Sequence, residues 1–284
     1  MTAPKPVCVT RLGRKMVANS LIGQISAGSD ARIATAREAF RQADRPMRHK
    51  MSDDLPPAEI DFLGMRMHVD PTDNYTDRCL WLDGVPPEIK SLTALIELIE
   101  GRRAFILDVG ANTGVFTVPF AMATASGSRI SSFEPHPVTR SRLNHNLRLN
   151  NLEARVDVFD CALGDVSGNA VLYQNNWNLG QCSLVPKRKG RVRATQQVKV
   201  RSILDFIEDD PSGFEISMIK LDVEGSEDRV LRPLINADGW LPEVILMETA
   251  HAALWQTEIA DLLLQRGFNA RRFETEGNTL FVRS

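Results

Sequence analysis

Short apolar runs alternate with longer segments of helical period from Ala104 to the end of the chain. The runs have the length and the β-branched and aromatic content of strands. They are Phe105–Val109, Arg129–Phe133, Val156–Phe159, Ser217–Leu221, Val244–Met247, Ala270–Phe273 and Thr279–Val282. The helical segments between them are Gly114–Ala125, Pro137–Leu149 and one ending at Asp261–Arg266. Strands alternating with helices predict an α/β fold with a doubly wound, mostly parallel, seven-stranded sheet, to which the C-terminal hairpin adds one antiparallel strand.

Two parts of the chain depart from this rhythm. Residues 1–58 form an N-terminal extension with a predicted helix at Asp30–Gln42, and residues 59–284 form the main domain. Within the main domain, residues 170–200 read as a strand, a long polar loop and a return strand, an excursion between the third and fourth strands. Additional predicted elements are a strand or hairpin at Ala58–Val69, a helix at Pro87–Leu98, and the two excursion strands Ala170–Tyr173 and Gln197–Val200.

Composition narrows the class of protein. The chain has 284 residues, of which 43% are hydrophobic and 25% charged, and a net charge of −2, so it carries no overall nucleic-acid signature. The first 50 residues hold ten Lys or Arg against three Asp or Glu. This basic arm either contacts an anionic partner or is a solvated, partly helical leader. No apolar stretch suggests a signal peptide or membrane span, and the four cysteines form no C-x-x-C pair, so a cytoplasmic protein with free thiols is expected.

A glycine-containing turn follows the first strand and opens a helix, in the sequence Asp108-Val109-Gly110-Ala111-Asn112-Thr113-Gly114. Glycine lets the backbone approach a ligand closely, and a helix start offers free N–H groups. The spacing is not the dinucleotide G-x-G-x-x-G, and no G-K-[ST] follows as in a P-loop. An acidic residue before the glycines suits the ammonium group of S-adenosylmethionine (SAM), directly or through water. We therefore assign Asp108, Gly110, Asn112 and Gly114 to a cofactor-binding turn.

The ends of the next two strands can hold the rest of a nucleoside. Glu134, in Phe133-Glu134-Pro135, lies 20 residues after Gly114, where a carboxylate accepts hydrogen bonds from ribose hydroxyls in NAD and SAM sites alike. The third strand is expected to close at Asp160-Cys161-Ala162, where a carboxylate can accept from the adenine amine and apolar groups can flank the ring. Glu134, Pro135, Asp160, Cys161 and Ala162 are therefore candidate cofactor contacts, with an exposed strand end or a loop as the alternative.

Acidic residues gather where the fourth strand ends, in Lys220-Leu221-Asp222-Val223-Glu224-Gly225-Ser226-Glu227. Asp222 and Glu224 alternate along an extended segment and can face the same side, so both are candidate catalytic bases, with Asp222 also near the methionine end of SAM. Glu227 is expected to open the next helix and complement its dipole. His251, after the fifth strand, is the rival base because its ordinary pKa suits proton transfer, although a histidine there is more often a surface residue.

Three features leave alternatives open. Asp222 and Glu248 end neighbouring strands and could share a divalent cation, but acidic clusters also arise where an amine binds, so no metal ligand is assigned. The basic loop Lys187–Arg193 is either a site for an anionic acceptor or nucleic acid, or a solvated hairpin tip. Trp177 either stacks on a sugar or packs in the core.

Six motifs then occur in one order: FILDVGANTG, SSFEPHP, NLRLNN, ALGDVSG, NLGQCS and IKLDVEGSE. Together they resemble the FkbM-type methyltransferase family over roughly residues 60–284. The resemblance implies a class I, Rossmann-like methyltransferase sheet that binds SAM, and O-methylation, typically of sugars or secondary metabolites. It also implies that Glu88 is the family's upstream acidic position and that Asn178, Gly180 and Ser183 are its N-x-G-x-x-S loop. The N-terminal 58 residues lie outside the resemblance.

The sequence thus predicts a SAM-dependent O-methyltransferase with a small-molecule or saccharide acceptor, no membrane partner, and an oligomeric state left open. In-line transfer requires alignment of oxygen, methyl and sulfur, and an alcohol acceptor needs a base or a metal. Three alternatives remain at this point: an NAD-dependent oxidoreductase, which shares the acid at Glu134 but lacks the glycine fingerprint; an RNA ribose methyltransferase, which the basic arm and loop would suit; and a non-catalytic SAM-binding module.

Overall fold

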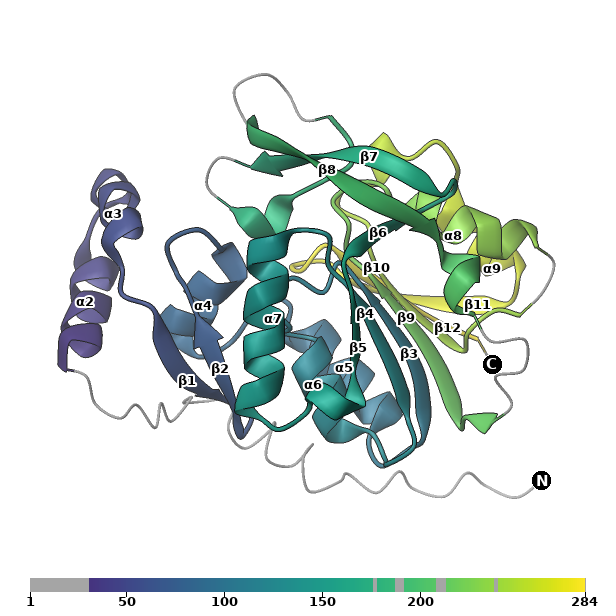
Figure 1. The fold of residues 1–284 in the computed structure, drawn as a ribbon, viewed down its shortest axis with the longest axis horizontal. Coiled ribbons are helices and arrows are strands. Elements are labelled where there is room, and N and C mark those ends of the chain that lie inside the picture. Colours follow the sequence, from purple (N-terminus) through teal and green to yellow (C-terminus); the bar gives the residue numbers. More distant parts are fainter. Residues whose placement is uncertain (1–30, 176–177, 187–191, 208–212, 238–239, 284) are drawn as a thin grey trace.

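The computed structural model describes residues 31–175, 178–186, 192–207, 213–237 and 240–283, and its centre is a seven-stranded sheet (Figure 1). From one edge to the other, the strands are β11 (Phe268–Phe273), β12 (Asn278–Arg283), β10 (Val244–Glu248), β9 (Ile216–Leu221), β3 (Ala104–Val109), β4 (Arg129–Phe133) and β5 (Asp157–Phe159). β12 pairs antiparallel with both of its neighbours, and the other pairs are parallel. The predicted doubly wound, mostly parallel sheet is therefore confirmed.

Side chains of the central strands alternate between two buried clusters, one on each face of the sheet. On β3, Ile106 packs in the first cluster, and Phe105 and Leu107 pack in the second. The first face is covered by α5 (Ile89–Ile99), α6 (Thr117–Ala123) and α7 (Pro137–Leu149), and the second by α8 (Glu227–Asn236) and α9 (Ile259–Gln265) (Figure 1). Burial on both faces explains why these strands read as continuous apolar runs.

Most predicted helices are present, with three corrections, the first of which is that α3 (Arg45–Met51) was not predicted. α6 begins three residues later than the predicted Gly114, because Gly114 has φ +93° and cannot start a helical turn. The helix α4 (Tyr75–Asp83) was not predicted at all; Asn74 caps its start by accepting from the N–H groups of Thr76 and Asp77. None of the helices in the described ranges is both long and apolar enough to cross a membrane.

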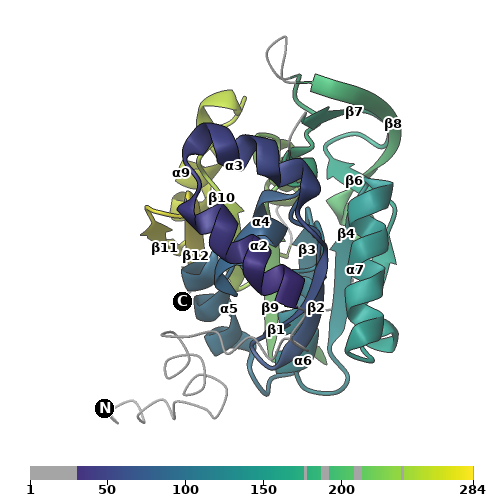
Figure 2. The same ribbon diagram turned by 90° about the vertical axis from the view of Figure 1, so that its left-hand side faces the viewer.

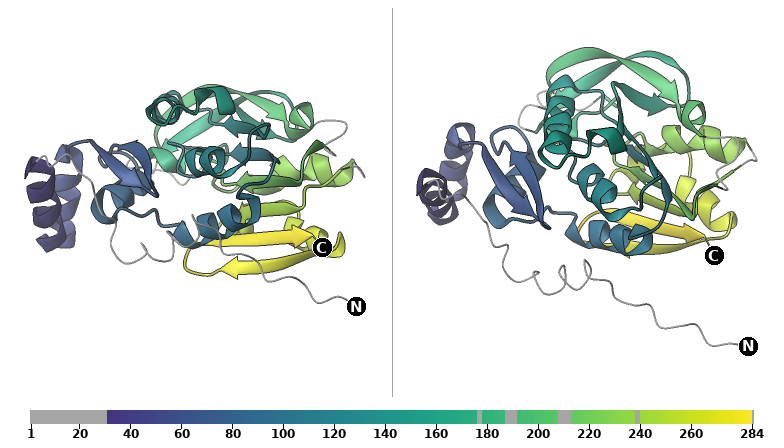
Figure 3. Two further views of the ribbon diagram at one scale, coloured as in Figure 1. Left: turned by 90° about the horizontal axis from the view of Figure 1, so that it is seen from below. Right: turned by 60° about the horizontal axis from the view of Figure 1, so that its bottom comes forward.

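The described part of the N-terminal extension packs at the end of the molecule farthest from α9 (Figures 1 and 3). It contains α2 (Ala31–Gln42), α3 (Arg45–Met51) and a short 3-10 turn, and the hairpin of β1 (Ala58–Phe62) and β2 (Met65–Val69) follows; Figure 2 shows α2 and α3 in front of this hairpin. Phe40 of α2 and Leu55 belong to the same buried cluster as the hairpin. The division of the chain at residue 58 stays a prediction.

A separate three-stranded sheet carries the predicted excursion above the strand ends (Figure 1). It consists of β6 (Cys161–Gly164), β8 (Val192–Ser202) and β7 (Gly168–Asn175), in that order, and η3 (Leu179–Gln181) lies in the loop after β7. β5 ends at Phe159, as predicted for the third strand, but the residues after it do not form a simple closing turn: Cys161 starts β6, which pairs with β8. Trp177 and residues 187–191 of the basic loop lie outside the described residues.

Candidate active site

The turn after β3 is held between the ends of β4 and β9. Gly110 and Ala111 donate their N–H groups to the carbonyl of Phe133 at 3.0 and 3.1 Å. Gly110 has φ +79°, and a Cβ there would lie 1.9 Å from the carbonyl oxygen of Asp222, so only glycine fits. Asn112 also has a left-handed backbone, with φ +51°, which asparagine tolerates better than most residues. Asn112 therefore stands where a dinucleotide fingerprint has its middle glycine, and its backbone is left-handed at that position.

Glu134 stands beside this turn with its carboxylate fixed by two backbone donors. Its Oε2 accepts the N–H of Asn112 and its Oε1 accepts the N–H of His136, each at 2.8 Å. Each oxygen keeps a second acceptor position. Burial raises the pKa of Glu134, and the hydrogen bonds to the two backbone groups oppose that rise. A carboxylate held in this way can accept one hydrogen bond from each hydroxyl of a diol.

A pocket with about 590 Å³ of empty space, part of it open to solvent, lies between the turn and the three-stranded sheet. Apolar groups from β6, β7 and the loop after β7 form one wall, opposite the polar strand ends. The predicted cofactor residues that line the pocket are Gly110, Asn112, Glu134, Pro135, Ala162 and Asp222.

The other predicted cofactor residues support the pocket or lie outside it. Asp108 is fully buried behind the turn, 3.3 Å from Lys220 Nζ, so an internal ion pair replaces the expected contact with a ligand ammonium group. Gly114 packs against α7, and Cys161 is buried beneath the pocket. The Asp160 side chain is 62% exposed and faces a lysine on β8, which leaves the adenine contact expected of it unformed in this arrangement.

The loop after β7 closes the pocket through the three positions of the N-x-G-x-x-S resemblance. Asn178 Oδ1 accepts the N–H of Gly180 at 3.1 Å and that of the first residue of α4 at 3.0 Å. A Cβ on Gly180 would lie 2.9 Å from Nδ2 of the Asn112 side chain. Ser183 Oγ donates to the carbonyl of Glu224 at 2.8 Å. The loop therefore joins α4, the turn after β3 and the segment after β9.

Asp222 follows β9 and presents its carboxylate to the pocket. Its side chain is 35% exposed, and its Oδ2 lies 3.9 Å from Lys220 Nζ. Burial raises the pKa of Asp222 to about 6; Lys220 opposes the rise and Glu224 adds to it. Burial, and then the charge of Asp222, raise the pKa of Glu88 to about 7. The carboxyl groups of Asp222 and Glu88 therefore titrate in the range that suits a general base near neutral pH.

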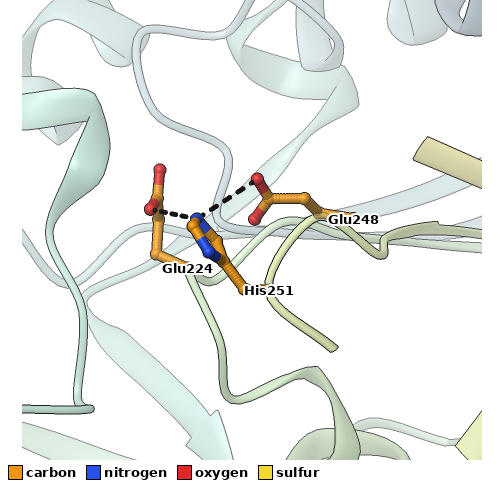
Figure 4. A group of neighbouring side chains, drawn as sticks. All are labelled: Glu224, Glu248 and His251. Atoms are coloured by element: carbon orange, nitrogen blue, oxygen red, sulfur yellow. Dashed lines mark ion pairs between the residues drawn. The ribbon is translucent and has the colours of Figure 1, made fainter. Parts of the chain in front are cut away.

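Glu224, Glu248 and His251 form a second group beside Asp222 (Figure 4). His251 Nε2 lies 3.2 Å from Glu224 Oε2 and 3.7 Å from Glu248 Oε1. Burial, and then the charges of Asp222 and Glu224, raise the pKa of Glu248 to about 10. Glu224 has φ +59° and does not line the pocket, so the expected alternation of Asp222 and Glu224 along an extended segment breaks at Glu224.

Among the residues that the structure describes, these three side chains form a group that could hold a metal ion, since their ligand atoms all lie within 4.8 Å of one another. The sequence analysis left open a cation shared by Asp222 and Glu248, and of these two only Glu248 belongs to this group. Glu227, by contrast, is the first residue of α8, as expected, and its Oε1 also accepts the N–H groups of Val223 and Gly225 in the preceding loop at 3.0 and 3.2 Å.

The family model for the Methyltransferase FkbM domain matches residues 108–270, which run from the end of β3 into β11. The chain belongs to the FkbM methyltransferase family. The match includes the pocket, the acidic segment after β9 and His251, and begins after α2, α3 and the first hairpin.

Two curated proteins that resemble this FkbM methyltransferase are themselves named methyltransferases. Methyltransferase 1 of Beauveria bassiana (strain ARSEF 2860) is 29% identical over 182 residues, which are 58% of this chain and 72% of the relative. Methyltransferase sdnD of Sordaria araneosa is 27% identical over 198 residues, 61% of this chain and 76% of that protein. The crystal structure of methyltransferase FkbM from Methylobacillus flagellatus KT is 16% identical, with 96% of this chain and 61% of that chain covered and a TM-score of 0.42.

Sequence reasoning missed two groups that shape this FkbM site. Lys220 lies inside the apolar run of β9, and a lone charge in a buried strand was the signal that could have revealed it. Asn74 donates from Nδ2 to Asn112 Oδ1 at 2.8 Å, and nothing in its local sequence marks that contact across 38 residues.

Proposed function

We propose that this chain is a SAM-dependent O-methyltransferase that binds SAM in the pocket beside the β3 turn and methylates a hydroxyl of a small molecule or saccharide. The observation that carries the proposal is the meeting of the left-handed turn, Glu134 and Asp222 in one pocket. Family membership supports methyl transfer and sets aside the oxidoreductase alternative.

The residues of the pocket fit the three parts of SAM. The fixed carboxylate of Glu134 suits the ribose diol, and Ala162, Leu163 and Pro135 offer apolar flanks for an adenine ring. Asp222 stands at the far side of the turn, where its negative charge suits the ammonium of the methionine part. When bound, SAM supplies a methyl group activated by its sulfonium charge.

On the acceptor side, the chain has to remove a proton from a hydroxyl. Asp222 is the proposed base, because it is both at the pocket and partly exposed. The rival is His251, which Glu224 and Glu248 hold by their carboxylates. Either group takes the proton as the oxygen gains its new bond.

Calorimetric titration tests the cofactor assignment without knowledge of the acceptor. We expect SAM and S-adenosylhomocysteine (SAH) to bind and NAD not to bind, and Glu134→Ala to weaken SAH binding at least ~10-fold, because two charge-assisted hydrogen bonds to the ribose are lost. Glu97→Ala, an exposed change on α5, is the matched control and should bind SAH as the wild type does. The proposal is contradicted if the wild-type protein binds neither SAM nor SAH, or if Glu134→Ala binds SAH with unchanged affinity.

Chelation tests whether transfer needs a divalent ion at Glu224, Glu248 and His251. We expect EDTA to leave the rate within ~2-fold, because His251 already pairs with Glu224 and burial raises the pKa of Glu248 to about 10, so that its carboxyl group is uncharged near neutral pH. The assay follows SAH formation with a panel of hydroxylated acceptors. A loss of ~10-fold or more that Mg²⁺ or Mn²⁺ restores would assign the ion to this group instead.

A further inference from the structure

Two charged side chains face each other in the middle of the central sheet. Asp108 on β3 and Lys220 on β9 are direct register partners, and they are 0% and 3% exposed. The pair before them on the same face, Ile106 and Met218, is apolar. Because desolvating two charges costs several kcal/mol, an apolar pair at this position would serve a purely structural purpose at least as well.

The ammonium group of Lys220 reaches from this pair to both sides of the pocket. Its Nζ donates to the carbonyl of Gly110 at 2.7 Å and lies 3.3 Å from Asp108 Oδ1. It is also 3.9 Å from Asp222 Oδ2. The ammonium group therefore holds the Gly110 carbonyl by a hydrogen bond and attracts the carboxylates of Asp108 and Asp222 as ion-pair partners.

The contact between the turn and β9 has no spare room. The position of a Cβ on Gly110 lies 1.9 Å from the Asp222 carbonyl oxygen, so the two backbones are pressed together. Lys220 bonds to the same Gly110 residue from within β9 and thereby fixes its peptide plane. A small change at Lys220 therefore moves the turn relative to Asp222.

We propose that Lys220 is a positioning residue, which sets the cofactor turn at Gly110 and the carboxylate of Asp222 in a fixed relation to each other. The inference rests on the proposed function, because it assumes that the turn binds SAM. Lys220 acts through the turn and Asp222 and does not touch the cofactor itself.

Three variants separate positioning from mere support of the fold. Lys220→Met leaves the buried Asp108 with the hydrogen bond from Thr117 but without its cationic partner, so it should lower both the melting temperature and SAH affinity. Asp108→Asn/Lys220→Met removes both charges, so stability should return towards the wild type while SAH affinity stays at least ~10-fold weaker. Lys220→Arg keeps the charge, but its planar head cannot hold the Gly110 carbonyl as the ammonium does, so affinity should fall ~3-fold or more in a stable protein.

SAH titration and thermal unfolding of these variants decide the matter, with the exposed Lys90→Met as the control that should match the wild type in both. The proposal is overturned if the double variant regains wild-type SAH affinity along with its stability, or, should that variant not fold, if Lys220→Arg binds SAH as the wild type does. Failure of the proposed function has a different signature, since the wild type itself would then not bind SAH.

Discussion

Asp222→Ala is expected to lower methyl transfer at saturating SAM at least ~100-fold and to weaken SAH binding, because the ammonium of the methionine part loses its carboxylate, while the melting temperature changes little. General-base catalysis contributes about 10²–10⁴-fold in enzymes, and Asp222 is the carboxylate that lines the pocket beside the acidic segment. Its side chain is 35% exposed and lies 3.9 Å from Lys220 Nζ, so its removal deletes one long ion pair and little buried surface. The measurement is SAH formation with an acceptor identified from a panel, together with a melting curve.

The wild-type rate should also depend on pH in a way that Asp222 explains. Burial raises the pKa of this carboxyl to about 6, so the basic form is populated above that value and the rate should rise as pH increases through about 6. Asp157→Ala, an exposed change on β5, is the matched control and should leave rate and profile unaltered. Near-wild-type turnover by Asp222→Ala would remove Asp222 from the base role and leave His251 as the remaining candidate.

Gly110→Ala is expected to abolish detectable SAH binding and to destabilise the fold by more than ~2 kcal/mol. The added methyl would have to occupy space 1.9 Å from a backbone oxygen of the neighbouring strand, which no side-chain rotation relieves. The left-handed backbone adds a further ~1–2 kcal/mol for any residue with a Cβ. Calorimetric titration and urea unfolding measure the two effects.

The chain offers a close control for this change in Gly64, at the tip of the β1–β2 hairpin. Gly64 has φ +80°, almost the same as Gly110, but nothing lies within 4 Å of its Cβ position. Gly64→Ala should therefore carry the conformational cost alone, about 1 kcal/mol, and should bind SAH normally. Equal behaviour of the two variants would show that the close approach to β9 has no part in binding.

The sequence predicted the elements whose signals are local. β4 and α7 have the predicted boundaries, because β4 is buried along most of its length and α7 starts at a proline and ends at Asn150. α4 was missed because its nine residues mix Tyr, Thr, Asp, Arg and Trp without a clear apolar period, although the Asn74 cap and Gly84 stop were present. β6 was missed because its partner, β8, lies more than 30 residues further along the chain.

The site followed the same rule. Residues at the ends of β3, β4 and β9 were predictable, because the carboxyl ends of parallel strands meet at one edge of the sheet. Contacts made across the fold were not: Glu224 with His251, and Asp108 with Lys220, depend on backbone turns and strand register that no local pattern encodes. The pairing of Asp160 with β8 had the same origin.

The order of strands has a consequence for synthesis on the ribosome. β3 is made early, yet its neighbour β9 comes more than 100 residues later in the chain. Until β9 emerges, one edge of β3 lacks its partner and the turn at Gly110 has neither the Asp222 backbone nor the Lys220 ammonium against it. An unfinished chain that stops before β9 therefore carries an open sheet edge, the kind of surface on which nascent chains associate and chaperones act.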